Sequence, residues 1–263
     1  MFEVSVIIPV YNAARFVQRA VDSAVCLNDV GEVILIEDGS PDNAIAVCRD
    51  LAEAYDKVRL LQHPNGENRG AGASRNLGIQ NARCEFIAFL DADDYYLDNR
   101  FDIERRMFED RVAVDGVYGG TAVQYESELG RRQFLDTGHK YQEFTSVNGR
   151  VTPEKFVLVA FGQHPTVRGG FHTDAITVKR DLFKCTGLFN EDLRLRQDTH
   201  MWARMAAVGK LAPGIIDKPV AIRGIHENNR MTDTEEQRKY DHLWWDDLHQ
   251  WFCRSKVSRT AWK

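Results

Sequence analysis

Three carboxylates stand within four residues of one another, directly after a largely apolar segment. Asp91, Asp93 and Asp94 follow residues 84–90, whose composition predicts a buried strand. Side chains at positions i and i+2 of an extended segment point the same way, so Asp91 and Asp93 are expected to converge where the strand ends. Two such carboxylates repel each other unless a cation lies nearby. A hard divalent ion that also binds phosphate would compensate their charge, while a solvated acidic turn is the simpler alternative.

The N-terminal third of the chain supplies the elements that would position these carboxylates. Apolar runs at 4–10, 32–36, 58–61 and 85–90 predict strands. Between them, apolar residues recur at helical spacing over 13–24, 44–54 and 73–81, the last after a glycine-rich loop at 65–72. Strands that alternate with helices predict an α/β fold with a mostly parallel central sheet. Ligands of such sheets bind at the carboxyl ends of the strands, which is where Asp91 and Asp93 stand.

The alternation of strands and helices stops near residue 115. Segments 117–125 and 131–135 have the pattern of a hairpin or of edge strands, 175–178 and 219–225 that of strands, and 152–161, 199–208 and 234–253 that of helices. No linker rich in Pro, Gly or Ser separates the halves, so we expect one compact unit. Trp244, Trp245 and Trp251 fall near helical spacing in the last helix and predict a packing face. The same face could contact a second subunit, as in a homodimer, or a membrane surface.

Composition excludes several classes of partner. The chain has 34 basic and 39 acidic residues and a net charge of −5, which disfavours nucleic acid as a partner because phosphate backbones require a basic surface. The five cysteines are widely spaced and form no C-x-x-C pair, so neither a zinc site nor a disulfide framework is indicated. No signal-peptide pattern and no apolar run of about 20 residues is present, and a cytoplasmic location is therefore expected.

Four segments with recognisable motifs follow one another in a fixed order. They are VSVIIPVYN at 4–12, IEDGS at 36–40, GASRNLG at 72–78 and FLDADD at 89–94. Together they closely resemble the family 2 inverting glycosyltransferases with a GT-A fold. The resemblance covers most of residues 3–100, resumes at residues 187–193 and at Gln197-Asp198, and extends to residues 226–230. It implies a GT-A fold with a nucleotide-sugar-binding subdomain at 1–115 and an acceptor-binding subdomain with the C-terminal helices at 116–263.

The resemblance also implies a nucleotide pocket at the ends of the first strands. Asp38 is expected to accept a hydrogen bond from the nucleotide base, typically uracil, although Asp also suits a turn. Pro9 and Tyr11 should line the same pocket, with Tyr11 either against the base or in the core. Arg75 is expected near the diphosphate, because a cation just inside a helix start opposes the helix dipole and is better explained by a nearby anion. An ion pair with Asp91 alone would be the structural alternative.

A divalent metal, Mn²⁺ or Mg²⁺, is the cofactor that the resemblance implies. Asp93 is expected to bind the metal directly, and Asp91 to bind it through water or to contact the ribose. His226 is a further candidate ligand, with a purely structural histidine as the alternative. Arg230 could then reach the diphosphate as a charge-assisted donor.

Asp198 is the expected catalytic base. Direct displacement at the anomeric carbon requires a base that reaches the acceptor hydroxyl on the face opposite the leaving nucleotide. Relatives usually carry Glu-Asp where this chain has Gln197-Asp198, so only the first carboxylate of the pair is lost. A helix cap is the alternative role for Asp198, because Asp caps helices well.

The sequence therefore predicts a metal-dependent inverting glycosyltransferase in the cytoplasm. Peripheral contact with the inner membrane face is a further option for its location. Its expected partners are a nucleotide-diphospho-sugar, with a UDP-sugar favoured, and a glycan or lipid-linked acceptor. A sugar-phosphate nucleotidylyltransferase is one alternative, but the glycine-rich loop that such an enzyme has after its first strand is missing here. A catalytically silent relative that binds nucleotide sugars is the other alternative.

Overall fold

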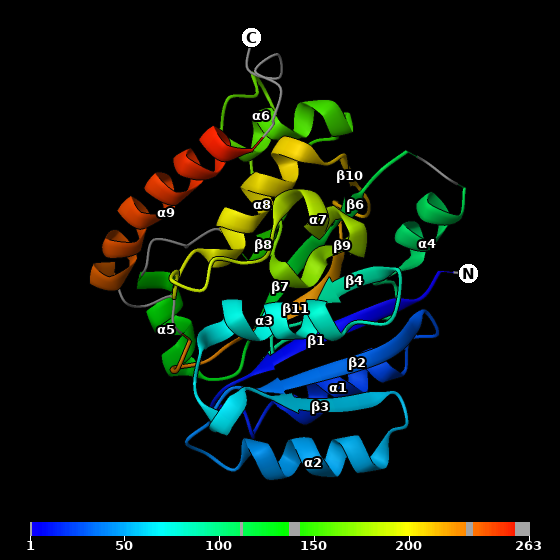
Figure 1. The fold of residues 1–263 in the computed structure, drawn as a ribbon, viewed down its shortest axis with the longest axis vertical. Coiled ribbons are helices and arrows are strands. Elements are labelled where there is room, and N and C mark those ends of the chain that lie inside the picture. Colours follow the sequence, from blue (N-terminus) through cyan, green and yellow to red (C-terminus); the bar gives the residue numbers. More distant parts are fainter. Residues whose placement is uncertain (1, 111–112, 137–142, 230–233, 256–263) are drawn as a thin grey trace.

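The computed structural model describes residues 2–110, 113–136, 143–229 and 234–255. Strands run through the middle of the molecule, and helices cover them on both sides (Figure 1). The strands of the larger sheet are β1 (Val4–Val10), β2 (Val30–Glu37), β3 (Val58–Gln62), β4 (Phe86–Phe89), β6 (Gly116–Tyr118), β9 (Ile176–Lys179) and β10 (Leu211–Pro213). Their spatial order is β10-β6-β9-β4-β1-β2-β3. Neighbouring strands are parallel except where β9 pairs with β4 and β6. The predicted mostly parallel α/β architecture is confirmed.

A second, smaller sheet flanks the first. It consists of β5 (Tyr95–Tyr96), β7 (Gly120–Tyr125), β8 (Phe144–Thr145) and β11 (Pro219–Ile225), in the order β5-β11-β7-β8. The helices are α1 (Val17–Val25), α2 (Ala44–Ala54), α3 (Gly70–Asn81), α4 (Asp102–Glu109), α5 (Glu128–Asp136), α6 (Phe156–Ala160), α7 (Phe183–Thr186), α8 (Gln197–Val208) and α9 (Thr234–Arg254). Strands from beyond residue 115 thus complete the sheet that β1–β4 begin, while the functional division at residue 115 stays a prediction.

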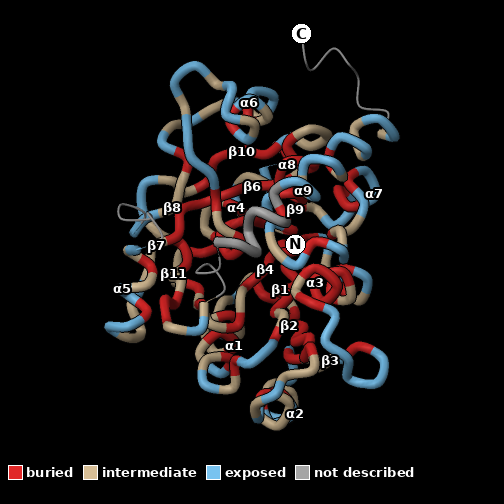
Figure 2. The backbone as a smooth tube through the Cα atoms, turned by 90° about the vertical axis from the view of Figure 1, so that its left-hand side faces the viewer, coloured by how far each residue is buried: buried red, intermediate tan, exposed pale blue. Residues whose placement is uncertain are grey.

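Both faces of the larger sheet are buried, as the continuous apolar runs predict. Alternate residues of β1 point to opposite faces. Val6 and Ile8 belong to a core that includes α1 and α2, whereas Ile7 belongs to a second core that includes residues of α3 and α8. The backbone of these strands is mostly buried and the outer loops are exposed (Figure 2).

Two sequence-based expectations about elements are wrong. Residues 131–135 lie in helix α5, although their pattern suggested a strand. This helix packs its buried Gly130 closely against the backbone at His226, and such a long-range contact has no local sequence pattern. Trp245 is 58% exposed, so it does not share the packing face of α9 that Leu248 and Trp251 form.

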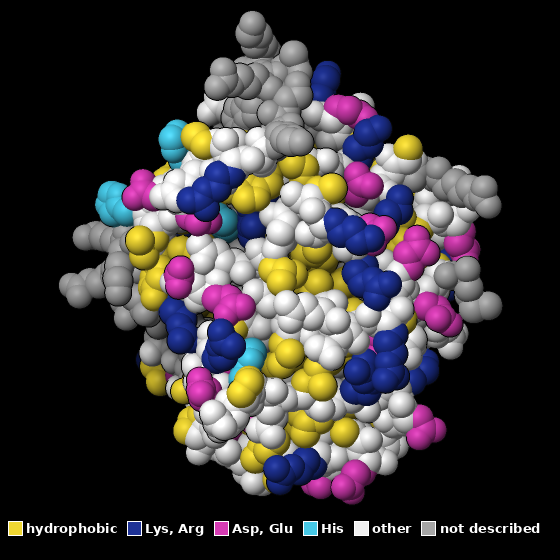
Figure 3. Space-filling model, in the orientation of Figure 1, with side chains coloured by type: hydrophobic (Ala, Val, Ile, Leu, Met, Phe, Trp, Pro, Cys, Tyr) yellow, Lys and Arg dark blue, Asp and Glu magenta, His cyan; other side chains and the backbone are white. Residues whose placement is uncertain are grey.

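The surface carries both signs of charge. On the face drawn in Figure 3, basic and acidic side chains are interspersed, and apolar side chains lie between them in small groups. Among the described residues, no helix is long and apolar enough to cross a membrane.

Candidate active site

A cleft of about 610 Å³ lies where the carboxyl ends of β1 and β2 and the loop after β4 meet the start of α8. Its walls include every sequence-predicted site residue that the structure describes. These are Pro9, Tyr11, Asp38, Arg75, Asp91, Asp93, Asp198 and His226. Arg230 lies outside the described residues. The fold therefore brings motifs from distant parts of the chain to one hollow.

The nucleotide-pocket candidates lie at the ends of the first two strands. Tyr11 is 40% exposed, so its ring is not part of the core. Asp38 is buried, and its two carboxylate oxygens accept hydrogen bonds from the backbone amides of Arg69 (2.7 Å) and Gly70 (2.9 Å). These bonds fix the start of α3. Each carboxylate oxygen has a further lone pair, so the capping role leaves Asp38 able to accept another bond in the cleft.

Arg75 is buried in the second turn of α3 and pairs with Asp91. Asp91 belongs to the loop after β4 that carries Asp91, Ala92 and Asp93, the D-x-D loop. Because α3 begins at Gly70, the expectation that Arg75 lies just inside a helix start is wrong, and the dipole argument does not apply. Its guanidinium Nη2 donates to Asp91 Oδ1 at 2.7 Å. Burial raises the pKa of Asp91, and the charge of Arg75 opposes that rise. The ion pair thus offsets part of the cost of a charged carboxylate at this position.

Asp93 forms a second cluster with residues that follow β11. His226 Nε2 and Asn229 Nδ2 each lie 3.0 Å from Asp93 Oδ2. The ring of Phe16 stacks on that of His226, with centroids 4.6 Å apart. The packing of Phe16 and the contacts of Asn229 hold the imidazole of His226 and the carboxylate of Asp93 toward each other. His226 is therefore positioned to bind the same ion as Asp93.

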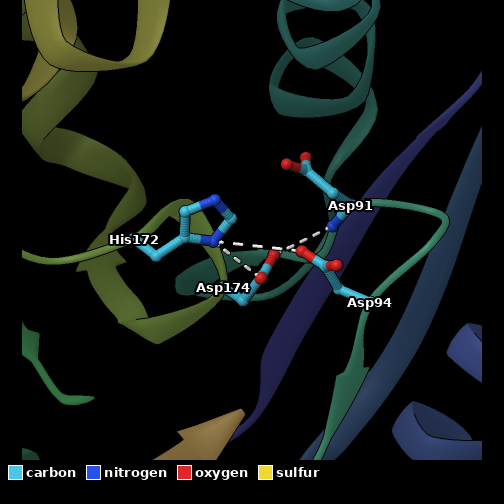
Figure 4. A group of neighbouring side chains, drawn as sticks. All are labelled: Asp91, Asp94, His172 and Asp174. Atoms are coloured by element: carbon cyan, nitrogen blue, oxygen red, sulfur yellow. Dashed lines mark hydrogen bonds and ion pairs between the residues drawn. The ribbon is translucent and has the colours of Figure 1, made fainter. Parts of the chain in front are cut away.

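Beneath the D-x-D loop lies a third group, which the sequence did not predict as a unit. Asp174 Oδ1 accepts a bond of 3.0 Å from the Asp91 amide, and Asp174 Oδ2 lies 2.7 Å from His172 Nδ1. Asp94 Oδ1 accepts a bond of 2.8 Å from the Gly224 amide. In Figure 4 the carboxylates of Asp94 and Asp174 face His172, while the carboxylate of Asp91 points away from them.

The two buried carboxyl groups of Asp94 and Asp174 have opposite pKa shifts. Burial raises the pKa of Asp94 well above its usual value, and the negative charge of Asp174 raises it further. Burial would also raise the pKa of Asp174, but the charge of His172 and the hydrogen bonds from His172 and Asp94 lower it to about 2. Asp94 is thus the more easily protonated of the two carboxyl groups.

Two sets of acidic groups could hold a metal. Oxygen or nitrogen atoms of Asp91, Asp94, His172 and Asp174 lie within 4.8 Å of one another. In that set, however, Asp94 and Asp174 already use their oxygens for hydrogen bonds to one another, to backbone amides and to His172. The side chains of Asp91 and Asp93 are 31% and 27% exposed and line the cleft. The D-x-D pair is therefore the more accessible donor set for an oxygen-seeking ion.

Asp198 faces the cleft from the first turn of α8. The helix begins at Gln197, one residue before Asp198. Asp198 Oδ1 accepts a bond of 2.7 Å from the next backbone amide, that of Thr199. Arg196, the residue before the helix, has a left-handed backbone with φ of 62°. This conformation turns the chain sharply into the helix and brings Asp198 to the cleft wall.

Asp174 and Asn229 were missed as functional residues. Asn229 belongs to the residues 226–230 that carried the resemblance, so its motif was available. Asp174 had no such pattern, since it reaches the D-x-D loop only through the antiparallel pairing of β9 with β4.

The model of glycosyl transferase family 2 matches residues 5–160. The chain belongs to glycosyl transferase family 2. EpsJ of Bacillus subtilis, described as an uncharacterized glycosyltransferase, is 38% identical over 201 residues, which cover 74% of this chain and 54% of EpsJ. An uncharacterized glycosyltransferase of Rickettsia felis is 28% identical over 252 residues, or 94% of this chain and 38% of that protein. The chain thus spans about half or less of the length of these two relatives.

Solved structures confirm the GT-A fold. The family 2 chain is similar to S. aureus TarS with a TM-score of 0.66 and 15% identity, over 98% of this chain and 41% of TarS. A structure of TarS residues 1–349 in complex with UDP-GlcNAc gives a TM-score of 0.64 at 17% identity, over 98% and 74% of the two chains. At these identities the likeness concerns the fold.

Proposed function

We propose that this family 2 chain transfers a sugar from a nucleotide-diphosphate donor, with a UDP-sugar as the expected donor, to a hydroxyl group of a glycan or lipid-linked acceptor. The observation that carries the proposal is the single cleft that Asp38, the Asp91–Asp93 pair and Asp198 all line. The TarS complexes with UDP and UDP-GlcNAc support the choice of donor. Similarity to a chondroitin synthase of Pasteurella multocida and to the succinoglycan biosynthesis protein ExoU of Rhizobium meliloti supports a role in polysaccharide synthesis.

A divalent ion fits the donor set that Asp91 and Asp93 present, with His226 as a third candidate ligand. A mannosyltransferase from Pyrobaculum calidifontis with the same fold, at a TM-score of 0.62, was solved in complex with GDP-Man and Mn²⁺. When bound, the ion supplies Lewis-acid stabilisation of the charge on the leaving diphosphate. Arg75 favours the charged form of Asp91 that this role requires, because their ion pair opposes the effect of burial.

Asp198 acts on the acceptor. As the acceptor oxygen bonds to the anomeric carbon and the bond to the diphosphate breaks, the Asp198 carboxylate takes the hydroxyl proton. One base suffices, because direct displacement forms no covalent intermediate, and the anomeric configuration inverts.

Thermal unfolding with a panel of UDP-, GDP- and dTDP-sugars, with and without Mn²⁺, tests the donor assignment. The UDP-sugar is expected to raise the melting temperature in proportion to the logarithm of its concentration over its dissociation constant, and more so with Mn²⁺. Stabilisation by GDP- or dTDP-sugars alone would overturn the choice of UDP. Binding without metal-dependent hydrolysis or transfer would indicate a catalytically silent protein, and formation of UDP-sugar from UTP and a sugar phosphate a nucleotidylyltransferase.

A further inference from the structure

His172 lines the cleft but has no role in the reaction proposed above. It directly precedes the short turn Thr173–Ala175 that leads into β9. Its ring lines the cleft, with 17% of the side chain exposed. The ring therefore reaches the space beside the D-x-D loop from the second half of the chain.

Asp174 fixes the tautomer and the direction of this ring. Asp174 is wholly buried, its Oδ1 accepts the bond from the Asp91 amide, and its Oδ2 faces the ring of His172. The short contact of 2.7 Å then requires a proton on His172 Nδ1. The other nitrogen, Nε2, is then left for a partner in the cleft, to which it donates when the ring is charged and from which it accepts when the ring is neutral.

The Nε2 atom is free to meet a ligand. Among the described residues, no group forms a hydrogen bond to it. Figure 4 shows the second ring nitrogen on the side away from Asp94 and Asp174, the side to which the Asp91 carboxylate also points. The unpaired ring nitrogen and the Asp91 carboxylate thus face the same part of the cleft.

We propose that His172 is a specificity-determining residue whose Nε2 forms a hydrogen bond with a hydroxyl group of the transferred sugar, with Asp174 as its positioning residue. This inference rests on the proposed function. In a nucleotide-diphospho-sugar, the sugar is attached to the distal phosphate and lies beside the groups that hold the diphosphate. His172 neighbours Asp91 and not the base-pocket residue Asp38. A sugar hydroxyl both donates and accepts, so it pairs with Nε2 in either protonation state of the ring, whereas a phosphate oxygen only accepts and pairs only with a charged ring.

Calorimetric titration of UDP and of the UDP-sugar, each with Mn²⁺, tests the inference on His172→Phe and His172→Gln. A lost hydrogen bond to a buried polar group should weaken UDP-sugar binding by His172→Phe about 5- to 50-fold, with UDP binding unchanged. His172→Gln keeps an acceptor and should recover part of the affinity. The matched control is His242→Phe, which changes an exposed histidine of α9 and should leave both affinities unaltered.

Analogues of the UDP-sugar that each lack one hydroxyl provide the second measurement. Wild type should bind one of these analogues as weakly as His172→Phe binds the complete UDP-sugar. His172→Phe should bind that analogue and the complete UDP-sugar equally well. An equal loss of UDP and UDP-sugar affinity would overturn the inference in favour of a metal or diphosphate contact. Unchanged affinity for both ligands in the two variants would also overturn it. Failure of the proposed donor site is distinguishable, because wild type would then bind neither UDP nor the UDP-sugar.

Discussion

The carboxylate of Asp174 accepts a hydrogen bond of 3.0 Å from the backbone amide of Asp91, across 83 positions of sequence. This bond joins the turn Thr173–Ala175, which precedes β9, to the loop that carries Asp91 and Asp93. Because Asp174 is buried and charged, the bond is stronger than one between neutral groups. The D-x-D loop is thus held from below, while its Asp91 and Asp93 side chains remain open to the cleft.

Replacing Asp174 by Asn should destabilise the fold. The substitution removes the charge that three donors share and places an amide beside the Asp91 amide, and the expected loss is about 2–3 kcal/mol of unfolding free energy. Urea titration measures this loss. Asp181→Asn, which changes a largely exposed aspartate of the same half, is the control and should shift stability by less than about 0.5 kcal/mol. A wild-type midpoint in Asp174→Asn would contradict the role of this carboxylate.

Asp93→Ala should abolish the part of nucleotide stabilisation that depends on metal. The variant removes one carboxylate of the accessible pair and leaves Asp91 without its partner ligand. Melting temperatures with UDP, with and without Mn²⁺, should then coincide. Asp56→Ala, at an exposed aspartate remote from the cleft, should behave as wild type. A full Mn²⁺ effect in Asp93→Ala would show that the metal binds elsewhere.

Asp198→Asn should keep donor binding and lose transfer. Asn has the same shape but cannot take a proton from the acceptor, so a decrease in kcat of about 10²- to 10⁴-fold is expected. Single-turnover transfer and the dissociation constant for UDP-sugar, measured on the same preparation, separate the two effects. Weakened donor binding with turnover retained would refute the assignment of the base.

Protonation of His200 should destabilise the protein in mild acid. His200 is fully buried on α8, and its Nε2 lies 2.9 Å from Asp247 Oδ2 of α9. Burial and the charge of Arg204 lower its pKa to about 4, against the opposing effect of Asp247. Between pH 6.5 and pH 4 the unfolded chain binds a proton that the native state does not. Stability should therefore fall as pH falls through this window, by on the order of 2–3 kcal/mol.

The His200→Gln variant isolates that contribution. Its unfolding free energy should depend less steeply on pH between 6.5 and 4 than that of wild type, when both are measured by urea titration. His242→Gln, at an exposed position of α9, should retain the wild-type dependence. Identical pH profiles for wild type and His200→Gln would contradict the buried neutral histidine.

The sequence by itself determined the elements and motifs that are local. Apolar runs predicted the first strands, and β11 has the expected bounds, because burial on a sheet leaves a pattern in neighbouring residues. The spacing of Asp91 and Asp93 and the turn at residues 38–40 also predicted side chains at strand ends. The structure places Asp38, Asp91 and Asp93 in one cleft.

Only the tertiary structure decided which distant residues complete the site. His226 and Asn229 reach Asp93, and His172 and Asp174 reach Asp91 and Asp94, through strand pairings that join segments about 80 to 136 positions apart. The antiparallel pairing of β9 with β4 brings His172 and Asp174 to Asp91 and Asp94. Such pairings follow from the packing free energy of the whole chain, which no short stretch of sequence encodes.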